Sequence, residues 1–494
     1  MELTGENFIG YTASKAGNKS FRTFNPILDT YNLTVHYNAT NKEINDAAEK
    51  ARAAFPIYAR TSYKERAAFL LKIAELLHKN RQDLLAVYHK ESGLPLQRGE
   101  SELNRTIHQL ELFAKVITAR HFGEMAQESA DRSRKPAAKP SFHKILLPLG
   151  PVVVFGASNF PFAYSTIGGD AASALAAGCP VIIKSHPMHA GTSEAVTRIV
   201  LQAARNSHMP DGIFSNLNAA TNTIGEQLVK HPYIKAVGFT GSIAGGTALL
   251  KYGQDRPEPI PVFCEMGSLN PVFIFPGSSK KRKEIASRLA VSITNDSGQF
   301  CTKPGLIFIE NNENGKFFIQ ELKEAFLQQG SQPMLQPSIC NNYHTLINAI
   351  DQLPRVKILR IPPLQKNFGT PQLSFADFRS FQKHLLLQQE VFGPHSVIIS
   401  CTKEEFEQAP LLLSGNLTAS VWMDRKELKS AADFMFLLQQ KAGRIIFNGV
   451  PTGVEVTHGM HHGGPFPSTS DSRFTAVGND AIYRFLRPVS LQNF

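Results

Sequence analysis

The sequence predicts an α/β protein with two parallel-sheet domains in tandem, because short apolar runs alternate with helical segments from residue 145 onward. The first series of Val/Ile-rich runs comprises 150–158, 179–186, 213–219 and 234–242. A second series follows residue 264, with runs at 270–276, 305–310, 396–400 and 443–449. Continuous apolar strands joined by helical crossovers are typical of a parallel sheet that is covered on both faces.

The first 120 residues before this alternation predict mostly helix. Ser62 and Glu65 have the spacing of a capping box and precede apolar residues at helical intervals. Gly93 and Pro95 predict the end of a second helix. The polar, proline-bearing segment 126–140 indicates a linker or an exposed excursion.

Composition places the chain among ordinary globular proteins, with 42% hydrophobic and 19% charged residues. We expect no signal peptide, and no stretch approaches the ~18 consecutive apolar residues of a membrane span. Five scattered cysteines without a C-x-x-C motif do not predict a disulfide framework. We therefore expect a reduced, cytoplasmic protein with no membrane partner.

The net charge of +11 would suit a nucleic-acid or anionic membrane partner. However, the densest basic runs, 280–284 and 132–140, contain no interleaved aromatic residues and no recognisable nucleic-acid motif. We interpret the charge as a solvated surface and expect no nucleic-acid partner.

A glycine-bearing turn in 235–250 is the first candidate binding feature. A predicted strand leads into Thr240, Gly241 and Ser242, and a helix follows. Such a turn lets an anion approach the free N–H groups of a helix N-terminus. The G-x-G-x-x-G fingerprint is absent, so a tight turn that only needs small residues is the alternative.

Asn159 and Glu265 each follow a predicted strand, at the edge where α/β folds bind ligands. The Asn159 amide could cap a helix or donate to a developing oxyanion. Glu265 could be a salt-bridge partner or, if partly desolvated, a general base. The residues themselves leave both alternatives open.

Cys301 lies in the segment NDSGQFCTKPG, residues 295–305, just after a helix predicted over 282–297. It could be a buried structural cysteine or a nucleophile. A free thiol has a pKa of ~8.5, so a nucleophile would need activation by neighbouring N–H groups, by Lys303 or by a bound cation. A histidine loop, with His458, His461 and His462, is broken by glycines, so we expect a pocket-lining loop and no metal site.

Taken together, these motifs resemble the aldehyde dehydrogenase superfamily over essentially the whole chain. The matching motifs are Asn159-Phe160-Pro161, Lys184, Phe239-Thr240-Gly241-Ser242, Glu265-Met266-Gly267, Gly298-Gln299-Phe300-Cys301 and Glu390-Val391-Phe392-Gly393-Pro394. Segments 265–273, 451–473 and 484–494 are similar to the α-ketoglutaric semialdehyde (2,5-dioxovalerate) dehydrogenase branch. The block 155–194 is shared with NADP-dependent fatty aldehyde dehydrogenases.

The resemblance implies oxidation of an aldehyde to a carboxylic acid through a thiohemiacetal and a thioester on Cys301. Asn159 and the Cys301 backbone N–H would hold the oxyanion, and Glu265 would activate the hydrolytic water. The implied substrate is α-ketoglutaric semialdehyde and the product 2-oxoglutarate. Alternatives are a long-chain aldehyde dehydrogenase, a cysteine hydrolase without a cofactor, and an inactive relative with a nucleic-acid-binding or structural role.

The resemblance also implies a nicotinamide cofactor, NADP or NAD. The implied binding residues are Lys184, Ser185, His186, Phe239, Thr240, Gly241, Ser242, Glu390 and Phe392. NAD-preferring relatives often carry a glutamate three residues after the lysine, where this chain has Pro187. We therefore expect NADP to be favoured. Candidate substrate residues are Phe162, Ser268, Gln299, His461 and Arg473.

The implied architecture is a Rossmann-type cofactor domain, an α/β catalytic domain and a small β bridging element. We place the cofactor domain at 1–125 and 147–263 and the catalytic domain at 264–468. The bridging element would combine 126–146 with 478–494 and serve a homodimer or homotetramer.

Overall fold

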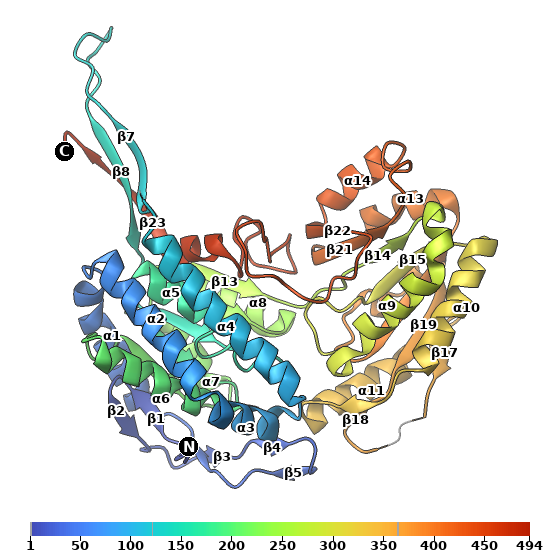
Figure 1. Cartoon of the computed structure of the whole chain (residues 1–494), viewed down its shortest axis with the longest axis horizontal. Coiled ribbons are helices and arrows are strands. Elements are labelled where there is room, and N and C mark those ends of the chain that lie inside the picture. Colours follow the sequence, from blue (N-terminus) through green and yellow to red (C-terminus); the bar gives the residue numbers. More distant parts are fainter. Residues whose placement is uncertain (1, 121, 363–364) are drawn as a thin grey trace.

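The computed structural model describes residues 2–120, 122–362 and 365–494. Two lobes are visible in Figure 1, one formed by the N-terminal half and the other by most of the C-terminal half. Each lobe contains a seven-stranded, mostly parallel sheet with helices on both faces. The predicted α/β class with two tandem sheets is confirmed.

The first sheet has the order β13-β12-β9-β10-β11-β1-β2. Its strands are β13 (Val262–Glu265), β12 (Ala236–Thr240), β9 (Val152–Phe155), β10 (Val181–Lys184), β11 (Phe214–Leu217), β1 (Asn7–Ile9) and β2 (Thr12–Ser14). The five neighbouring strands from β13 to β11 are parallel, and the order reverses direction at β9. Ligands of open α/β sheets bind beyond the carboxyl ends of the strands at such a switch point.

Helices cover both faces of this sheet. They are α1 (Asn41–Tyr58), α2 (Tyr63–Lys79), α3 (Arg81–Ser92), α4 (Leu96–Ile117), α5 (Gly169–Ala177), α6 (Ala190–Asn206), α7 (Thr223–Lys230) and α8 (Ile243–Gln254). The capping box of Ser62 and Glu65 begins α2 as predicted, and Gly93, at a φ of 66°, ends α3. One apolar core lies under α2–α6 and another under α1, α7 and α8.

The first 40 residues differ from the helical prediction. They form β1 and β2, which extend the sheet, and the short strands β3 (Ser20–Phe21), β4 (Phe24–Asn25), β5 (Thr30–Tyr31) and β6 (His36–Tyr37). Strands of two or three residues are too short to show an alternating pattern. β1 is set by its antiparallel pairing with β11, where Phe8 lies opposite Asn216.

The second sheet has the order β17-β19-β20-β15-β14-β21-β22. Its strands are β17 (Lys357–Arg360), β19 (Gln372–Asp377), β20 (His395–Cys401), β15 (Leu306–Glu310), β14 (Val272–Ile274), β21 (Asn416–Trp422) and β22 (Ala442–Phe447). The helices are α9 (Arg282–Thr294), α10 (Glu313–Leu327), α11 (Pro337–Asp351), α12 (Phe378–Lys383), α13 (Lys403–Leu412) and α14 (Ala432–Gln439). Apolar cores fill both faces, as a buried parallel sheet requires.

A three-stranded antiparallel sheet projects from the first lobe (Figure 1). It has the order β23-β8-β7, with β7 (Glu124–Glu128), β8 (Phe142–Pro148) and β23 (Leu486–Gln492). This sheet joins the two segments that we expected to form a bridging element. The division of the chain into domains stays a prediction.

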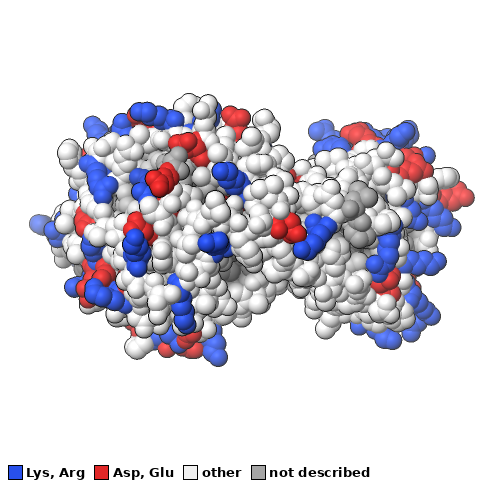
Figure 2. Space-filling model, turned by 90° about the horizontal axis from the view of Figure 1, so that it is seen from below, with Lys and Arg blue, Asp and Glu red and all other residues white. Residues whose placement is uncertain are grey.

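The surface carries both signs of charge. Figure 2 shows Lys and Arg interspersed with Asp and Glu over the visible face of both lobes. In the described part of the chain, no helix is both long and apolar enough to cross a membrane.

Candidate active site

Four predicted site residues stand at the ends of adjacent parallel strands. Lys184 ends β10, Thr240 ends β12 and Glu265 ends β13, while Asn159 follows β9. In the register of the sheet, Thr240 lies beside Glu265. The carboxyl ends of parallel strands meet at one edge, so the order of the strands alone gathers these side chains.

A sharp turn delivers Cys301 to the same place from the other lobe. The helix predicted over 282–297 ends at Thr294, because Asp296, Ser297 and Gly298 have φ values of 48°, 57° and 64°. A side chain at Gly298 would meet the Gly393 backbone, with its Cβ 2.3 Å from that carbonyl oxygen. The loop therefore needs glycine there, and it leads directly to the thiol.

Helix α4 holds the two loops that carry Asn159 and Cys301. The buried Glu102 carboxylate accepts hydrogen bonds from the backbone N–H groups of Phe162 and Ala163, at 2.8 and 2.9 Å. Arg98 pairs with Glu102 at 2.8 Å and with Asp296 at 2.8 Å. We call Glu102, Arg98 and Asp296 the α4 network. Through it, one helix fixes the positions of both loops.

The reactive groups lie within hydrogen-bonding reach of one another. His462 Nε2 is 2.7 Å from Glu265 Oε1 and 3.9 Å from Cys301 Sγ. Glu265 and His462 are both buried, and Glu265 Oε2 has no hydrogen-bond partner among the described residues. Asn159 Nδ2 donates to the Gln299 carbonyl at 2.8 Å, which leaves its second N–H available.

Cys301 lies at the boundary of two cavities. One, of about 930 Å³, is lined by Asn159, Glu265, Glu390 and Phe392 together with Thr240–Ser242. The other, of about 1280 Å³, is lined by α4, by aromatic side chains and by residues 452–456. Because the thiol lines both, a group bound in either cavity can reach it.

A groove of about 1400 Å³ continues from the first cavity along the carboxyl ends of the strands. Most of the predicted cofactor residues line it, namely Lys184, His186, Phe239, Thr240, Gly241 and Ser242. It also contains the start of α8, where the Ser242 hydroxyl accepts from the Gly245 N–H at 3.2 Å. None of the described residues that line the groove is Asp or Glu.

Ser185 lies away from this groove. Its side chain is buried, and its hydroxyl donates to Asn218 Oδ1 at 2.7 Å. Ser185 follows Lys184 directly at the end of β10, and consecutive side chains of an extended segment point to opposite sides.

The thiol pKa reflects its surroundings. Burial and the neighbouring Glu265 carboxylate raise the pKa of Cys301 well above its usual value, while Arg105 opposes them. Lys303, which we considered as an activator, does not fill that role. Its ammonium donates to the His395 carbonyl at 2.6 Å, and it interacts with Glu390. Burial raises the pKa of Glu390 to about 7.

The five candidate substrate residues are not brought into the lining of either cavity. Phe162 is in the core, stacked on Tyr88 with ring centroids 5.0 Å apart. The Ser268 hydroxyl donates to Asn270 Oδ1 at 2.9 Å, and the Gln299 side chain donates to the Asp296 carbonyl. Arg473 is exposed and pairs with Asp471, and His461 is half-buried in the same segment.

Three side chains in the site were not predicted as site residues. His462 was only part of the histidine loop, while Arg105 and Tyr164 line the cavity of about 1280 Å³. The Tyr164 ring lies 5.8 Å from the His462 ring. Predicting Arg105 as a site residue would have required knowing how α4 is oriented relative to Cys301. No local sequence pattern gives this orientation. That the histidine loop binds no metal stays a prediction.

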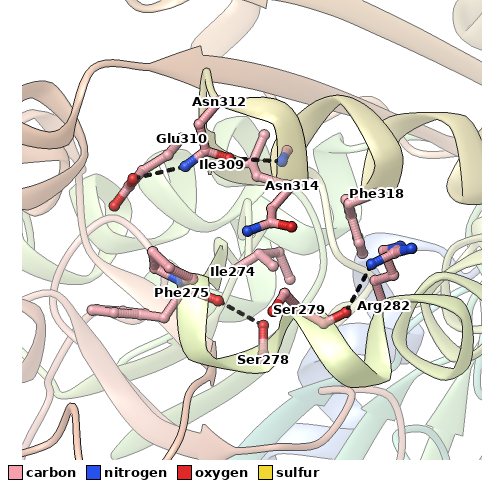
Figure 3. Close-up of a pocket in the computed structure, with 12 residues that line it drawn as sticks. Ile274, Phe275, Ser278, Ser279, Arg282, Ile309, Glu310, Asn312, Asn314 and Phe318 are labelled. Atoms are coloured by element: carbon pink, nitrogen blue, oxygen red, sulfur yellow. Dashed lines mark hydrogen bonds between the residues drawn. The ribbon is translucent and has the colours of Figure 1, made fainter.

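A separate hollow of about 300 Å³ lies where β14 and β15 end (Figure 3). Its polar groups bond mainly within the hollow. The Ser278 hydroxyl donates to the Phe275 carbonyl at 2.7 Å, and the Asn312 amide donates to Glu310 at 3.0 Å. It shares no lining residue with the two cavities at Cys301.

Comparison with known proteins agrees with this geometry. Residues 11–341 match the model of the aldehyde dehydrogenase family. The chain belongs to the aldehyde dehydrogenase family. The implied class of enzyme, an oxidoreductase acting on aldehydes, is thereby confirmed at the level of the family.

Two curated relatives share much of this aldehyde dehydrogenase sequence. One is α-ketoglutaric semialdehyde dehydrogenase 2 of Azospirillum brasilense, 40% identical over 100% of this chain and 95% of the relative. The other is α-ketoglutaric semialdehyde dehydrogenase of Acinetobacter baylyi, which is 42% identical over 92% of this chain and 87% of the relative.

Solved structures confirm the expected fold. An aldehyde dehydrogenase from Pseudomonas aeruginosa superposes with a TM-score of 0.86 at 19% identity, covering 100% of this chain and 97% of its own. An NADP-dependent glyceraldehyde-3-phosphate dehydrogenase from Bacillus halodurans has a TM-score of 0.85 at 19% identity, covering 100% of both chains.

Replacing Glu265 with Gln tests the electrostatics of the thiol. Removing the carboxylate charge lowers the Cys301 pKa, so the pH midpoint of iodoacetamide alkylation falls by about one unit. Alkylation is measured by mass spectrometry, with Cys301→Ala as the control because the other four cysteines are buried. A midpoint that stays or rises would show that Glu265 does not act on the thiol through its charge.

Proposed function

We propose that this aldehyde dehydrogenase oxidises α-ketoglutaric semialdehyde to 2-oxoglutarate, with NADP or NAD as hydride acceptor. The observation that carries the proposal is the position of Cys301 between two cavities, within reach of Glu265, His462 and Asn159. The substrate is supported by the two relatives, which match nearly the whole chain.

The reaction begins with removal of the thiol proton. Cys301 and Glu265 are neighbouring acids, so in the resting site the proton stays on sulfur. His462 bridges them, with Nε2 2.7 Å from the carboxylate and 3.9 Å from the thiol. The thiol proton is released to solvent as the thiolate forms. The thiolate then attacks the aldehyde carbon and forms a thiohemiacetal on Cys301.

The oxyanion of the thiohemiacetal is held by two donors, the free N–H of the Asn159 amide and the Cys301 backbone N–H. Loss of one such donor costs about 10²–10³ in turnover. The α4 network keeps the two donors aligned, since it fixes the loops that carry them.

The groove fits a dinucleotide phosphate. It contains the open N-terminus of α8, Lys184 and His186, and no described carboxylate lines it. Glu390 and Phe392 line the cavity between the groove and the thiol, where they would hold the nicotinamide end. When bound, the oxidised cofactor supplies a cationic ring that accepts the hydride. Pro187 stands three residues after Lys184, and none of the described residues of the groove lining carries a negative charge that would repel a 2′-phosphate, so we favour NADP.

Hydrolysis of the Cys301 thioester requires an activated water. Glu265 Oε2 is buried and has no partner in the described part of the chain, so it is free to accept a water proton. His462 orients the other carboxylate oxygen. The water oxygen adds to the thioester carbon, the C–S bond breaks, and the thiol is regenerated with the carboxylic acid.

The remaining expectations belong to the same proposal. The cavity beside α4 is lined by Arg105, which forms no ion pair among the described residues, and by the exposed Glu455. The unpaired charge of Arg105 favours a short anionic aldehyde over a long-chain one. The intact arrangement of Cys301 and Glu265 disfavours an inactive relative.

The projecting three-stranded sheet has an exposed β7 and suits a homodimer or homotetramer. We place the enzyme in the cytoplasm.

Steady-state kinetics test the proposed reaction. We expect reduction of NADP, and more weakly of NAD, with α-ketoglutaric semialdehyde, and loss of turnover by at least ~10³-fold in Cys301→Ala. Hexadecanal is the matched long-chain substrate. Efficient turnover of hexadecanal together with poor turnover of the semialdehyde would contradict the proposed substrate.

The pH dependence of cofactor binding tests the role of Lys184. Burial lowers the pKa of Lys184 to about 8, so its charge is present below that pH and is lost above it. We expect the Kd for NADP, measured by calorimetry, to rise about tenfold from pH 7 to pH 9.5. In Lys184→Met, we expect the affinity for NADP to be lower at pH 7 and not to change with pH. An unchanged pH dependence in the variant would exclude Lys184.

A further inference from the structure

The cavity beside α4 contains two arginines from the same helix, and they differ in their partners. Arg98 is neutralised, because it pairs with Glu102 and Asp296, both at 2.8 Å. Arg105, two helical turns further on, lines the same cavity as Cys301. Its hydrogen bond goes to a neutral group, the Tyr164 hydroxyl, at 2.6 Å. Among the described residues, no carboxylate forms an ion pair with Arg105.

Tyr164 fixes the orientation of Arg105. The guanidinium lies over the Tyr164 ring, 4.8 Å from its centroid, and donates one N–H to a hydroxyl. Burial raises the pKa of Tyr164, so its hydroxyl stays neutral and does not act as a counter-ion. A guanidinium has five N–H donors in a rigid fork that matches a carboxylate. The remaining donors of Arg105 are therefore available to an anion in the cavity.

A third arginine, Arg444, does not line the cavity but interacts electrostatically with Arg105. Arg444 donates to the carbonyls of Pro451 and Gly453, at 2.9 and 3.3 Å, and so holds the loop that forms the opposite wall. Arg105 contributes to lowering the Arg444 pKa, after burial, which shows that the two charges act on each other. Among the described residues, no carboxylate forms an ion pair with either arginine, and two such neighbouring cations are stabilised by an anionic ligand.

We propose that Arg105 binds the distal carboxylate of the substrate and thereby selects short aldehydes with an acid group at the far end. This inference rests on the proposed function and names the residue that gives it its specificity. The polar side chains of Asn104, His108 and Thr452 line the same cavity and are available to the 2-oxo group of the substrate. Arg444 is a positioning residue for the wall.

Holding the carboxylate at Arg105 also places the aldehyde carbon. A five-carbon chain is short, so an anchor at one end restricts the other end to the surroundings of Cys301. Phe160 and Phe300, whose ring centroids lie 5.6 Å apart, flank this path in the same cavity. Neutral aldehydes of the same length contact these rings without being held at the far end, and so react from many unproductive positions.

The experiment compares two aldehydes of equal chain length, α-ketoglutaric semialdehyde and pentanal, in the full-length enzyme with saturating NADP. In Arg105→Met, we expect kcat/KM for the semialdehyde to fall about 10²-fold, mainly through KM, and pentanal to change less than about threefold. Arg105→Lys should recover part of the loss. Lys115→Met removes a charge from an exposed site further along α4 and should leave both aldehydes unchanged.

Product-like inhibitors separate this inference from the proposed function. Glutarate carries a distal carboxylate that pentanoate lacks, and both can be tested against pentanal oxidation. We expect glutarate to inhibit at least about tenfold more strongly in the wild type, and this difference to vanish in Arg105→Met. A wild type that does not prefer the semialdehyde, but shows this Arg105-dependent inhibition, would contradict the substrate and support the carboxylate site.

Two results would overturn the inference. An equal loss for both aldehydes in Arg105→Met, with unchanged NADP binding and thermal midpoint, would assign Arg105 to the reaction step or to the structure of the site. A preference for the semialdehyde that persists in Arg105→Met would place carboxylate recognition elsewhere.

Discussion

The active site depends on the α4 network, which joins two loops from different lobes. Glu102 fixes the loop after Asn159 through two backbone N–H groups, and Arg98 links Glu102 to Asp296 in the loop before Cys301. The Asn159 amide then reaches the Gln299 carbonyl. The proposed oxyanion donor and nucleophile come from different lobes and can act together only if their distance is fixed. The partly buried Arg98, between two carboxylates, fixes this distance with directional hydrogen bonds.

Burial of the thiol has two consequences that work together. It raises the Cys301 pKa, with Glu265 adding to the effect, so the resting sulfur holds its proton and resists adventitious modification. It also strengthens the interaction of the thiolate with any cation brought close, because charges are screened less away from bulk water. In the proposed mechanism, a cationic group in the neighbouring cavity would therefore promote formation of the thiolate. Glu265, which raises the thiol pKa, also has an oxygen, Oε2, without a hydrogen-bond partner among the described residues, and the proposed hydrolytic step uses it.

Residues at the ends of strands could be predicted from the sequence, whereas contacts between distant helices could not. Lys184, Thr240, Glu265 and Asn159 follow apolar runs, and parallel pairing alone brings them to one edge. Predicting the position of His462 would have required knowing the path of a glycine-rich loop that has no regular secondary structure.

The substrate residues were the weakest part of the prediction. Arg473 was a candidate substrate residue, but it is exposed and pairs with Asp471, two residues away. Arg105 carried no local signal, since its role follows from the orientation of α4 against the second lobe. Sequence patterns indicate which residues share a face of a helix or lie at the end of a strand. They do not show which groups surround a charged side chain, and those groups decide whether it can bind a ligand.

The most direct measurement is mass spectrometry of the enzyme stopped between acyl transfer and hydrolysis. Glu265→Gln is mixed with α-ketoglutaric semialdehyde and NADP, quenched in acid and digested. The predicted result is a Cys301 peptide carrying the aldehyde as a thioester, heavier than the free peptide by the aldehyde mass less its two lost hydrogens. This adduct is absent when NADP is omitted. An adduct on another cysteine, or full acid production by this variant without any adduct, would contradict a thioester on Cys301 that Glu265 hydrolyses.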